Sequence, residues 1–178
     1  MYTIEEHKHR YNTWAASRAA STKRCRFEVS LGKEIIETIG LHLLISDPNT
    51  LPNPAQIDTA HREWRNAAII AANGKGLQGF SHGIAAKLIN VYLKGVFVCG
   101  GHEGHANVIA LHPPIDRLLL DELYLRNIGG LRSQWNIARK SRWSKFTSSQ
   151  YEDVINAIRK VMGSSPLWRV EEYWRGYQ

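Results

Sequence analysis

Apolar side chains recur along this chain at intervals of three or four residues, which is the period of an amphipathic helix. The clearest examples are Ile35, Ile36 and Ile39, the stretch from Ile57 to Ala71, and the stretch from Val154 to Met162. No segment shows the strict apolar–polar alternation that is typical of a half-buried strand. The pattern therefore predicts an all-α fold, a compact bundle of several helices.

Start and stop signals place these helices along the chain. Thr3-Ile4-Glu5-Glu6 has the spacing of a capping box and predicts a helix that runs to about Ala20. Three prolines between Ser46 and Pro54 predict a loop. The other predicted helices run from about Ser30 to Gly40, from Asn53-Pro54 to Asn73-Gly74, from Ser149-x-x-Glu152 to Gly163, and from Pro166 onward.

The composition is that of an ordinary soluble globular protein. The 178 residues are 43% hydrophobic and 22% charged, and they predict one domain over residues 1–178. No uninterrupted apolar run reaches the roughly 18 residues of a membrane span, and the first residues lack the apolar core of a signal peptide. The two cysteines give neither a disulfide framework nor the four thiolates of an iron–sulfur cluster. We therefore expect a cytoplasmic protein with no membrane contact and no cofactor.

The charge distribution favours an anionic partner. The net charge is +7, and residues 7–27 contain no Asp or Glu. Residues 123–151 are also free of acidic residues, and they carry Arg139, Lys140 and Arg142 among the aromatic residues Trp135, Trp143 and Phe146. Cations neutralise phosphates and aromatic rings stack on bases, so this composition is typical of nucleic-acid binding. The alternative for each tryptophan is a place in the core.

The stretch from Gly74 to Asp116 carries the candidate chemistry. It opens with a glycine-rich hairpin, residues 74–83, whose glycines allow positive φ and close approach to a ligand. A helix that follows such a hairpin directs free N–H groups at an anion such as a phosphate. Lys87 lies about one turn into that helix, and Pro113-Pro114-Ile115 leads Asp116 into the first turn of the next one. An irregular Gly- and His-rich loop is expected between them.

This order of features resembles the helix-hairpin-helix DNA glycosylases, and within them the small 8-oxoguanine glycosylase/lyase branch. The resemblance rests on the hairpin, on Lys87-x6-Lys94 and on Pro-x-Asp116, and it extends only from Gly74 to Asp116. The hairpin departs from the Leu-x-Gly-x-Gly spelling usual in that family. The loop before Asp116 is also long for the family. Lys94 itself fits the solvated face of the helix.

The resemblance implies a DNA glycosylase that flips a modified base out of double-stranded DNA and cleaves its N-glycosidic bond, with or without AP-lyase activity. Lys87 would attack the sugar and Asp116 would assist. The base would be an oxidised purine or, as in bacterial antiphage enzymes, a hypermodified phage cytosine. The residues expected to contact DNA are Lys75, Gly76, Gly79, Ser81, His82, Arg139, Lys140 and Arg142, and those expected to line the base pocket are Trp14, Trp64, Phe80 and also His82.

Two other functions are compatible with the sequence. Helix-hairpin-helix units also occur in non-catalytic DNA-binding proteins, although a carboxylate at Asp116 would repel phosphates there. A zinc hydrolase is the second alternative, since Cys and His are zinc ligands and they occur at Cys99, His102, His105 and His112. Their spacing matches none of the structural zinc patterns, and we expect no bound metal.

Overall fold

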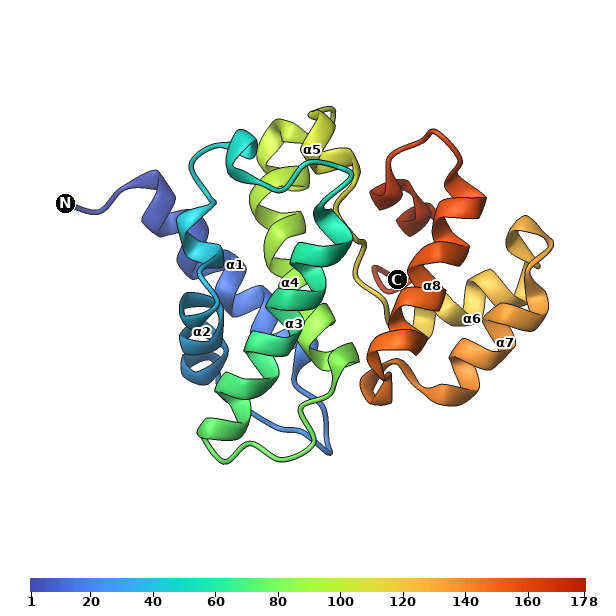
Figure 1. The fold of residues 1–178 in the computed structure, drawn as a ribbon, viewed down its shortest axis with the longest axis horizontal. Coiled ribbons are helices and arrows are strands. Elements are labelled where there is room, and N and C mark those ends of the chain that lie inside the picture. The colour runs from blue at the N-terminus through green and yellow to red at the C-terminus, as the bar shows by residue number, and fades with distance from the viewer.

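The computed structural model describes residues 1–178, and all of its regular elements are helical (Figure 1). This confirms the all-α prediction. Short 3₁₀ turns connect several of the helices, and a π-type helical segment, Lys94–His102, continues directly from α4. The α-helices are α1 (Ile4–Ala20), α2 (Val29–Thr38), α3 (Ile57–Gly74), α4 (His82–Leu93), α5 (Ala106–Ile109), α6 (Arg117–Leu125), α7 (Arg132–Ser141) and α8 (Ser148–Met162).

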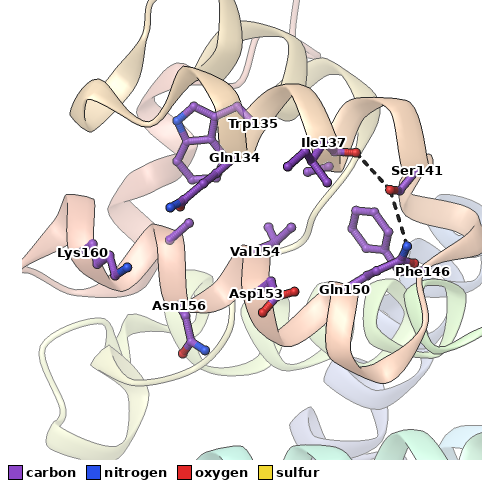
Figure 2. A pocket seen from close by; sticks show the side chains of 12 residues that line it. Gln134, Trp135, Ile137, Ser141, Phe146, Gln150, Asp153, Val154, Asn156 and Lys160 are labelled. Carbon is purple, nitrogen blue, oxygen red and sulfur yellow. Dashed lines mark hydrogen bonds between the residues drawn. The ribbon is translucent and has the colours of Figure 1, made fainter.

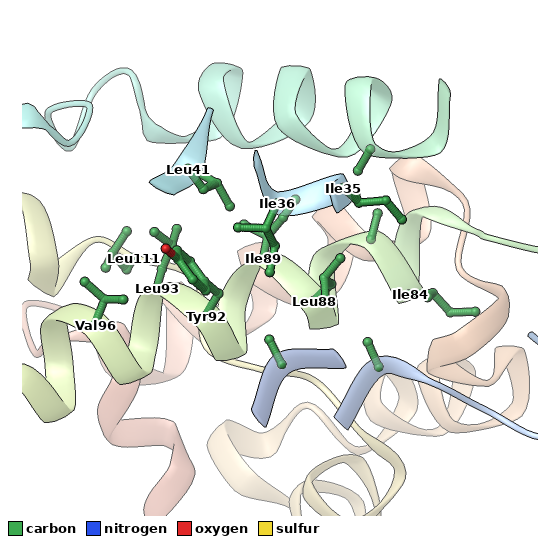
Figure 3. Packing of buried hydrophobic residues seen from close by; sticks show 14 of the residues in the cluster. Ile35, Ile36, Leu41, Ile84, Leu88, Ile89, Tyr92, Leu93, Val96 and Leu111 are labelled. Atoms are coloured by element: carbon green, nitrogen blue, oxygen red, sulfur yellow. The ribbon is translucent and has the colours of Figure 1, made fainter. Parts of the chain in front are cut away.

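The helices form two lobes, each with its own apolar core. In Figure 1 helices α1–α5 lie on one side and α6–α8 on the other, and the chain crosses between them in an extended strap, residues 111–116. A core of 22 buried residues fills the first lobe, and Figure 3 shows part of it, with Leu88, Ile89 and Tyr92 of α4 near Ile36 of α2. A core of 15 buried residues, including Trp135, fills the second lobe.

Helix α4 is the central element of the first lobe. Ten of its residues are buried, among them Lys87 and Asn90, and it packs on α1 and α3 as well as on α8 of the second lobe. The continuous helical stretch His82–His102 is long and apolar enough to cross a membrane, but 67% of its apolar window is buried within the protein. Such burial is that of a core helix, whose apolar surface is already covered by α1, α2 and α3.

Two predicted capping boxes differ from the observed helix caps. Thr3 does cap α1, accepting from the Glu6 N–H at 3.2 Å, but the Glu6 carboxylate pairs with Arg10 instead of completing a capping box. The capping box of α8 is formed by Thr147 and Gln150, not by Ser149 and Glu152. Glu152 is instead drawn to two arginines of α3, because a carboxylate gains more from paired guanidinium groups than from one backbone N–H.

Two predicted loop boundaries are also wrong. The Gly- and His-rich stretch is not irregular throughout, since Lys94–His102 is helical and Ala106–Ile109 forms α5. Burial of Val96 and Phe97 in the first core holds this segment in a helix despite its glycines. Helix α3 begins at Ile57, because Asn53 caps only the separate turn before it, with the Ala55 N–H 3.0 Å from Asn53 Oδ1.

Gly83 is required where α4 meets the second lobe, and this predicts the effect of a substitution. A Cβ at Gly83 would lie 1.7 Å from the Trp143 carbonyl oxygen. We expect Gly83→Ala to destabilise the protein by about 1 to 3 kcal/mol, although alanine is intrinsically favoured in a helix. Urea unfolding measures the change. Gly74→Ala, at the open end of α3, has no neighbour within 4 Å and is the control; equal stability of the two variants would contradict the prediction.

Candidate active site between the two lobes

Lys87 and Asp116 meet where the two lobes face each other. Lys87 Nζ lies 3.0 Å from Asp116 Oδ2, although the residues are 29 positions apart in the sequence. Lys87 is 7% exposed, so it does not occupy a solvated helix face. Asp116 is the N-cap of α6, where Oδ1 accepts the Leu119 N–H at 2.9 Å, as the Pro-Pro-Ile-Asp sequence predicted. The indole N–H of Trp174 donates to Oδ2 at 3.0 Å and fixes the carboxylate from a third side.

Asn90 sets the distance between these two residues. It lies nearly one turn after Lys87 on α4, and its amide donates to the Pro113 carbonyl oxygen at 3.0 Å and to the Tyr151 hydroxyl at 2.9 Å. Pro113 belongs to the strap that ends at Asp116. The same buried side chain therefore ties the helix that carries Lys87 to the strap that carries Asp116, and both to α8 of the second lobe.

A cavity of about 610 Å³ opens beside the Lys87–Asp116 pair. It contains a second ion pair, between Lys94 at the start of the π-type segment and Glu171 near the C-terminus. Lys94 is thus a cavity residue and not a solvated one. Burial raises the pKa of the Glu171 carboxyl, and the charge of Lys94 offsets part of that rise. The other lining residues are His7, Lys8, Tyr11, Asn12, Ala15, Ala19, Val91, Gly95, Cys99, Gly100, Pro114 and Trp174.

The aromatic residues predicted to form the base pocket do not line this cavity. Trp14 is 52% exposed on α1, Trp64 is half-buried against the core of the first lobe, and Phe80 is buried beside Phe27. The aromatic residues of the cavity are Tyr11 and Trp174. The sequence did not predict Glu171 and Trp174 as cavity residues. They follow the second lobe, and nothing in their local sequence indicates that this segment returns to α4.

Two glycines of the predicted hairpin have the positive φ that their sequence allows, but the start of the helix that follows is covered. Gly76 and Gly79 both have positive φ, 74° and 76°, and lie exposed in the loop between α3 and α4. Ser81 caps α4 and donates to the Ser144 carbonyl oxygen at 2.9 Å, so its hydroxyl is already engaged. Because the Trp143–Phe146 segment also packs on Gly83, the first turn of α4 is not open to a phosphate as predicted.

The remaining hairpin residues that were expected to bind DNA have protein partners or are buried in part. Lys75 forms an ion pair with Glu34 of α2, with both side chains about half exposed. His82 is half-buried, and its Nδ1 atom is buried without a hydrogen-bond partner. The surface that this hairpin presents to solvent is therefore mainly the backbone around Gly76 and Gly79.

The basic stretch between residues 123 and 151 is divided between core and surface. Trp135 and Phe146 are buried in the second core, as the alternative for the tryptophans anticipated. Arg139 pairs with Asp121 at 2.6 Å and lies over the Tyr124 ring, so its charge is already matched. Lys140 and Arg142 are exposed, and they border a surface hollow together with Arg117. Of the three predicted phosphate contacts, these two keep unmatched charges.

The proposed zinc ligands do not gather in one place. No group of three or more His, Cys, Asp or Glu side chains has the arrangement of a metal site. Cys99 is exposed, His105 caps α5 through its ring, and His112 is buried between the lobes. The folded chain places these residues apart from one another, so nothing in their arrangement supports the zinc hydrolase alternative.

The lobes are joined by a buried polar network that sequence reasoning missed. His112 bonds to Asp58 Oδ1 at 2.8 Å through Nε2 and to the Tyr151 hydroxyl at 3.0 Å through Nδ1. His61 Nε2 lies 2.7 Å from Asn90 Oδ1, and the His61 ring stacks on Tyr151 with centroids 5.3 Å apart. These residues come from α3, α4, the strap and α8, so no local pattern relates them.

The network lowers the pKa values of His61, His112 and Asp58. Burial, with His112 and Arg65 close by, holds the pKa of His61 well below its usual range. Burial also lowers the pKa of His112, and Asp58 opposes that change. The hydrogen bond from His112, followed by that from Arg159, strongly lowers the pKa of Asp58.

A separate groove runs between α7 and α8 (Figure 2). Its volume is about 350 Å³, with Trp135, Phe146 and Val154 inside and polar residues such as Asp153 and Lys160 at its edge. None of its lining residues borders the cavity beside Lys87 and Asp116. The cavity between the lobes, where buried charged groups converge, is therefore the candidate active site.

Comparison with protein-family models, with curated proteins and with solved structures finds no match to this chain.

The buried histidines predict acid sensitivity. The folded protein keeps His61 neutral, whereas the unfolded chain protonates it near its ordinary pKa of 6.5. The unfolded state then holds more protons, so the free energy of unfolding should fall as the pH drops from 7 to 5, by up to about 1.4 kcal/mol per pH unit for each extra proton. Urea unfolding at several pH values measures this slope.

The variant His61→Gln should show a shallower slope, because it removes one titrating group and retains an amide donor for Asn90. Glu152 adds little in this window, since its pKa is lowered by Arg62 from 4.5 to about 2. The exposed His7 provides the control, His7→Gln. An unchanged slope in His61→Gln would show that other groups cause the acid sensitivity.

Proposed function

We propose that this protein is a DNA glycosylase that removes a modified base from double-stranded DNA. The observation that supports this most directly is the Lys87–Asp116 contact of 3.0 Å at a cavity between two helical lobes. The two residues that the glycosylase resemblance assigns to chemistry are thus adjacent, partly shielded from water and next to a space large enough for a base. The assignment to this class remains a proposal that rests on the residues and their arrangement.

In the proposed reaction, the Lys87 amine passes its proton to the Asp116 carboxylate and attacks C1′ of the sugar. The C1′–N bond breaks, and the base leaves with the bonding electron pair and takes up a proton. As Asp116 passes this proton on to the departing base, its restored negative charge stabilises the positive charge that develops on the sugar. Its contacts with Leu119 and Trp174 hold it in position, so little reorganisation is needed.

Opening of the C1′–O4′ bond, with O4′ taking up a proton, then gives a Schiff base between Nζ and C1′. Loss of a C2′ proton to a base and of the 3′ phosphate from this Schiff base is the AP-lyase step. If water attacks C1′ in place of Lys87, the product is an intact strand with an abasic site. These products distinguish the bifunctional and monofunctional forms of the mechanism.

The proposed partner is DNA because unmatched cations border the cavity and the surface hollow beside it. Lys8 borders the cavity itself, and Arg117, Lys140 and Arg142 border the neighbouring hollow. The Arg24 carbonyl oxygen lies near Gly79 of the hairpin, which places the basic segment after α1 beside the hairpin loop. A base must leave the duplex to reach Lys87, and Tyr11 and Trp174 provide aromatic surface for it. We propose an oxidised purine or a hypermodified cytosine as the base.

A non-catalytic DNA-binding role is the main alternative. Such a protein needs exposed cations and no buried acid–base pair. Burying Lys87 and Asp116 at a cavity costs desolvation energy that a backbone-binding protein has no reason to incur. A panel of oligonucleotides with different modified bases, scored separately for abasic sites and for strand breaks, identifies the activity.

The first variant to test is Asp116→Asn. It should lower the rate of base excision by about 100-fold or more, since the charge that stabilises the sugar cation is lost. DNA affinity should stay the same or increase slightly. Asn is also a good N-cap, so α6 should remain folded. Single-turnover excision and a binding titration measure the two effects.

Asp121→Asn is the matched control, because it removes the same charge from α6 outside the cavity. Excision at the wild-type rate by Asp116→Asn would eliminate Asp116 as a catalytic residue. Loss of excision in both variants would indicate a general effect of charge on α6.

The second variant to test is Lys87→Gln. Borohydride should trap a covalent complex of wild-type protein with substrate DNA, and Lys87→Gln should abolish trapping because the nucleophile is absent. Gel electrophoresis of the reduced complex measures it. Lys94→Gln is the control. Lys94 directly follows α4 and lines the same cavity as Lys87. Trapping that depends on Lys94 instead would reassign the nucleophile, and excision without any trapping would mean a monofunctional enzyme.

A further inference from the structure

Helix α1 has its large aromatic residues on the outside. Tyr11 is 61% exposed and Trp14 is 52% exposed, and their ring centroids are 6.0 Å apart. Of the six tryptophans in the chain, Trp14 is the one that is neither buried nor half-buried. The buried side of α1 consists of small or polar residues, namely His9, Asn12, Thr13, Ala16, Ser17 and Ala20. Packing of the fold does not use these two rings.

The small residues on the inner side are there because α1 packs closely. Asn12 and Ser17 fill the space that a Cβ at Gly95 or Gly32 would occupy, which leaves no room for an aromatic ring. The exposed rings are therefore available for another partner. An adjacent pair of exposed aromatic rings is unusual on a soluble surface and marks a binding surface.

The surroundings of the pair indicate the chemistry of that partner. Tyr11 borders the cavity that holds Lys87 and Asp116, and Trp14 lies next to Tyr11 on the outer side. Lys8 and Arg18, one turn to either side on α1, form no ion pair with an acidic residue, and residues 7–27 contain no acidic residue at all. Flat aromatic surface combined with unmatched positive charge fits a nucleic-acid strand, whose bases stack and whose phosphates are anionic.

We propose that Tyr11 and Trp14 form a stacking surface for the base that is left unpaired opposite the nucleotide that occupies the cavity. This rests on the proposed function in one respect, that the cavity receives a nucleotide. A second copy of this chain is a poorer occupant, because two such basic helices would repel each other. Trp14, predicted as part of the base pocket, is thus reassigned to its outer edge.

The test uses a duplex that contains a non-cleavable abasic-site analogue with the fluorescent base 2-aminopurine opposite it. Stacking on an aromatic ring should change the 2-aminopurine emission when wild-type protein binds. Trp14→Ala should bind this duplex about tenfold or more weakly and lose the emission change. The dependence of affinity on salt should stay unchanged, since no phosphate contact is removed.

Two further variants control for loss of folding and of apolar surface. Trp14→Phe keeps a ring and should stay within about threefold of wild-type affinity. Ile70→Ala removes a side chain of similar exposure from α3 and should have no effect. Because this assay needs no excision, a stacking defect in Trp14→Ala supports the inference even if no modified base is ever excised.

Wild-type affinity and emission in Trp14→Ala would overturn the inference, even if Asp116→Asn shows that the protein is a glycosylase. A wild-type dimer in sedimentation analysis that Trp14→Ala converts to a monomer would also overturn it, by showing that the rings bind a second copy. Failure of the wild-type protein to bind any duplex would overturn this inference and the proposed function together.

Discussion

The buried amide of Asn90 is the contact on which the rest of the site depends. It accepts from His61, donates to the Pro113 carbonyl and donates to the Tyr151 hydroxyl, so it joins α3, α4, the strap and α8 at one point. A buried polar group left without its partners costs more free energy than most apolar contacts supply. This requirement allows one relative position of the two lobes, whereas a purely apolar seam tolerates sliding.

That fixed position explains how two charged residues remain close at a cavity. Lys87 precedes Asn90 on α4, and Asp116 follows Pro113 in the strap. The hydrogen bond from Asn90 to Pro113 therefore fixes the positions of both charged residues. Trp174 adds a contact from the C-terminal segment, and Glu171 places a second carboxylate beside Lys94. The second lobe thus closes the cavity and completes its polar lining.

On the outer surface, some positively charged side chains have no acidic partner. Arg139 is matched by Asp121 and Arg10 by Glu6, whereas Lys8 and Arg18 on α1 have no acidic partner. Lys140 and Arg142 also lack one. Unmatched charge near the cavity, together with the exposed rings of Tyr11 and Trp14, makes this face suited to an extended anionic ligand. We therefore regard the cavity and α1 as parts of one proposed nucleic-acid surface.

The sequence by itself determined the helical class, most helix positions, the capping role of Asp116 and the positive φ of the hairpin glycines, because each depends on residues within a few positions of one another. It also proposed Lys87 and Asp116 as candidate catalytic residues, through a local motif, but not that the two lie in contact. Only the tertiary structure decided that Trp14 faces solvent, that Trp174 and Glu171 reach the cavity, and that His61, Asn90, His112 and Tyr151 meet between the lobes. The physical reason is that periodicity specifies which face of a helix is buried but not which neighbour covers it. That choice depends on packing between residues distant in the chain.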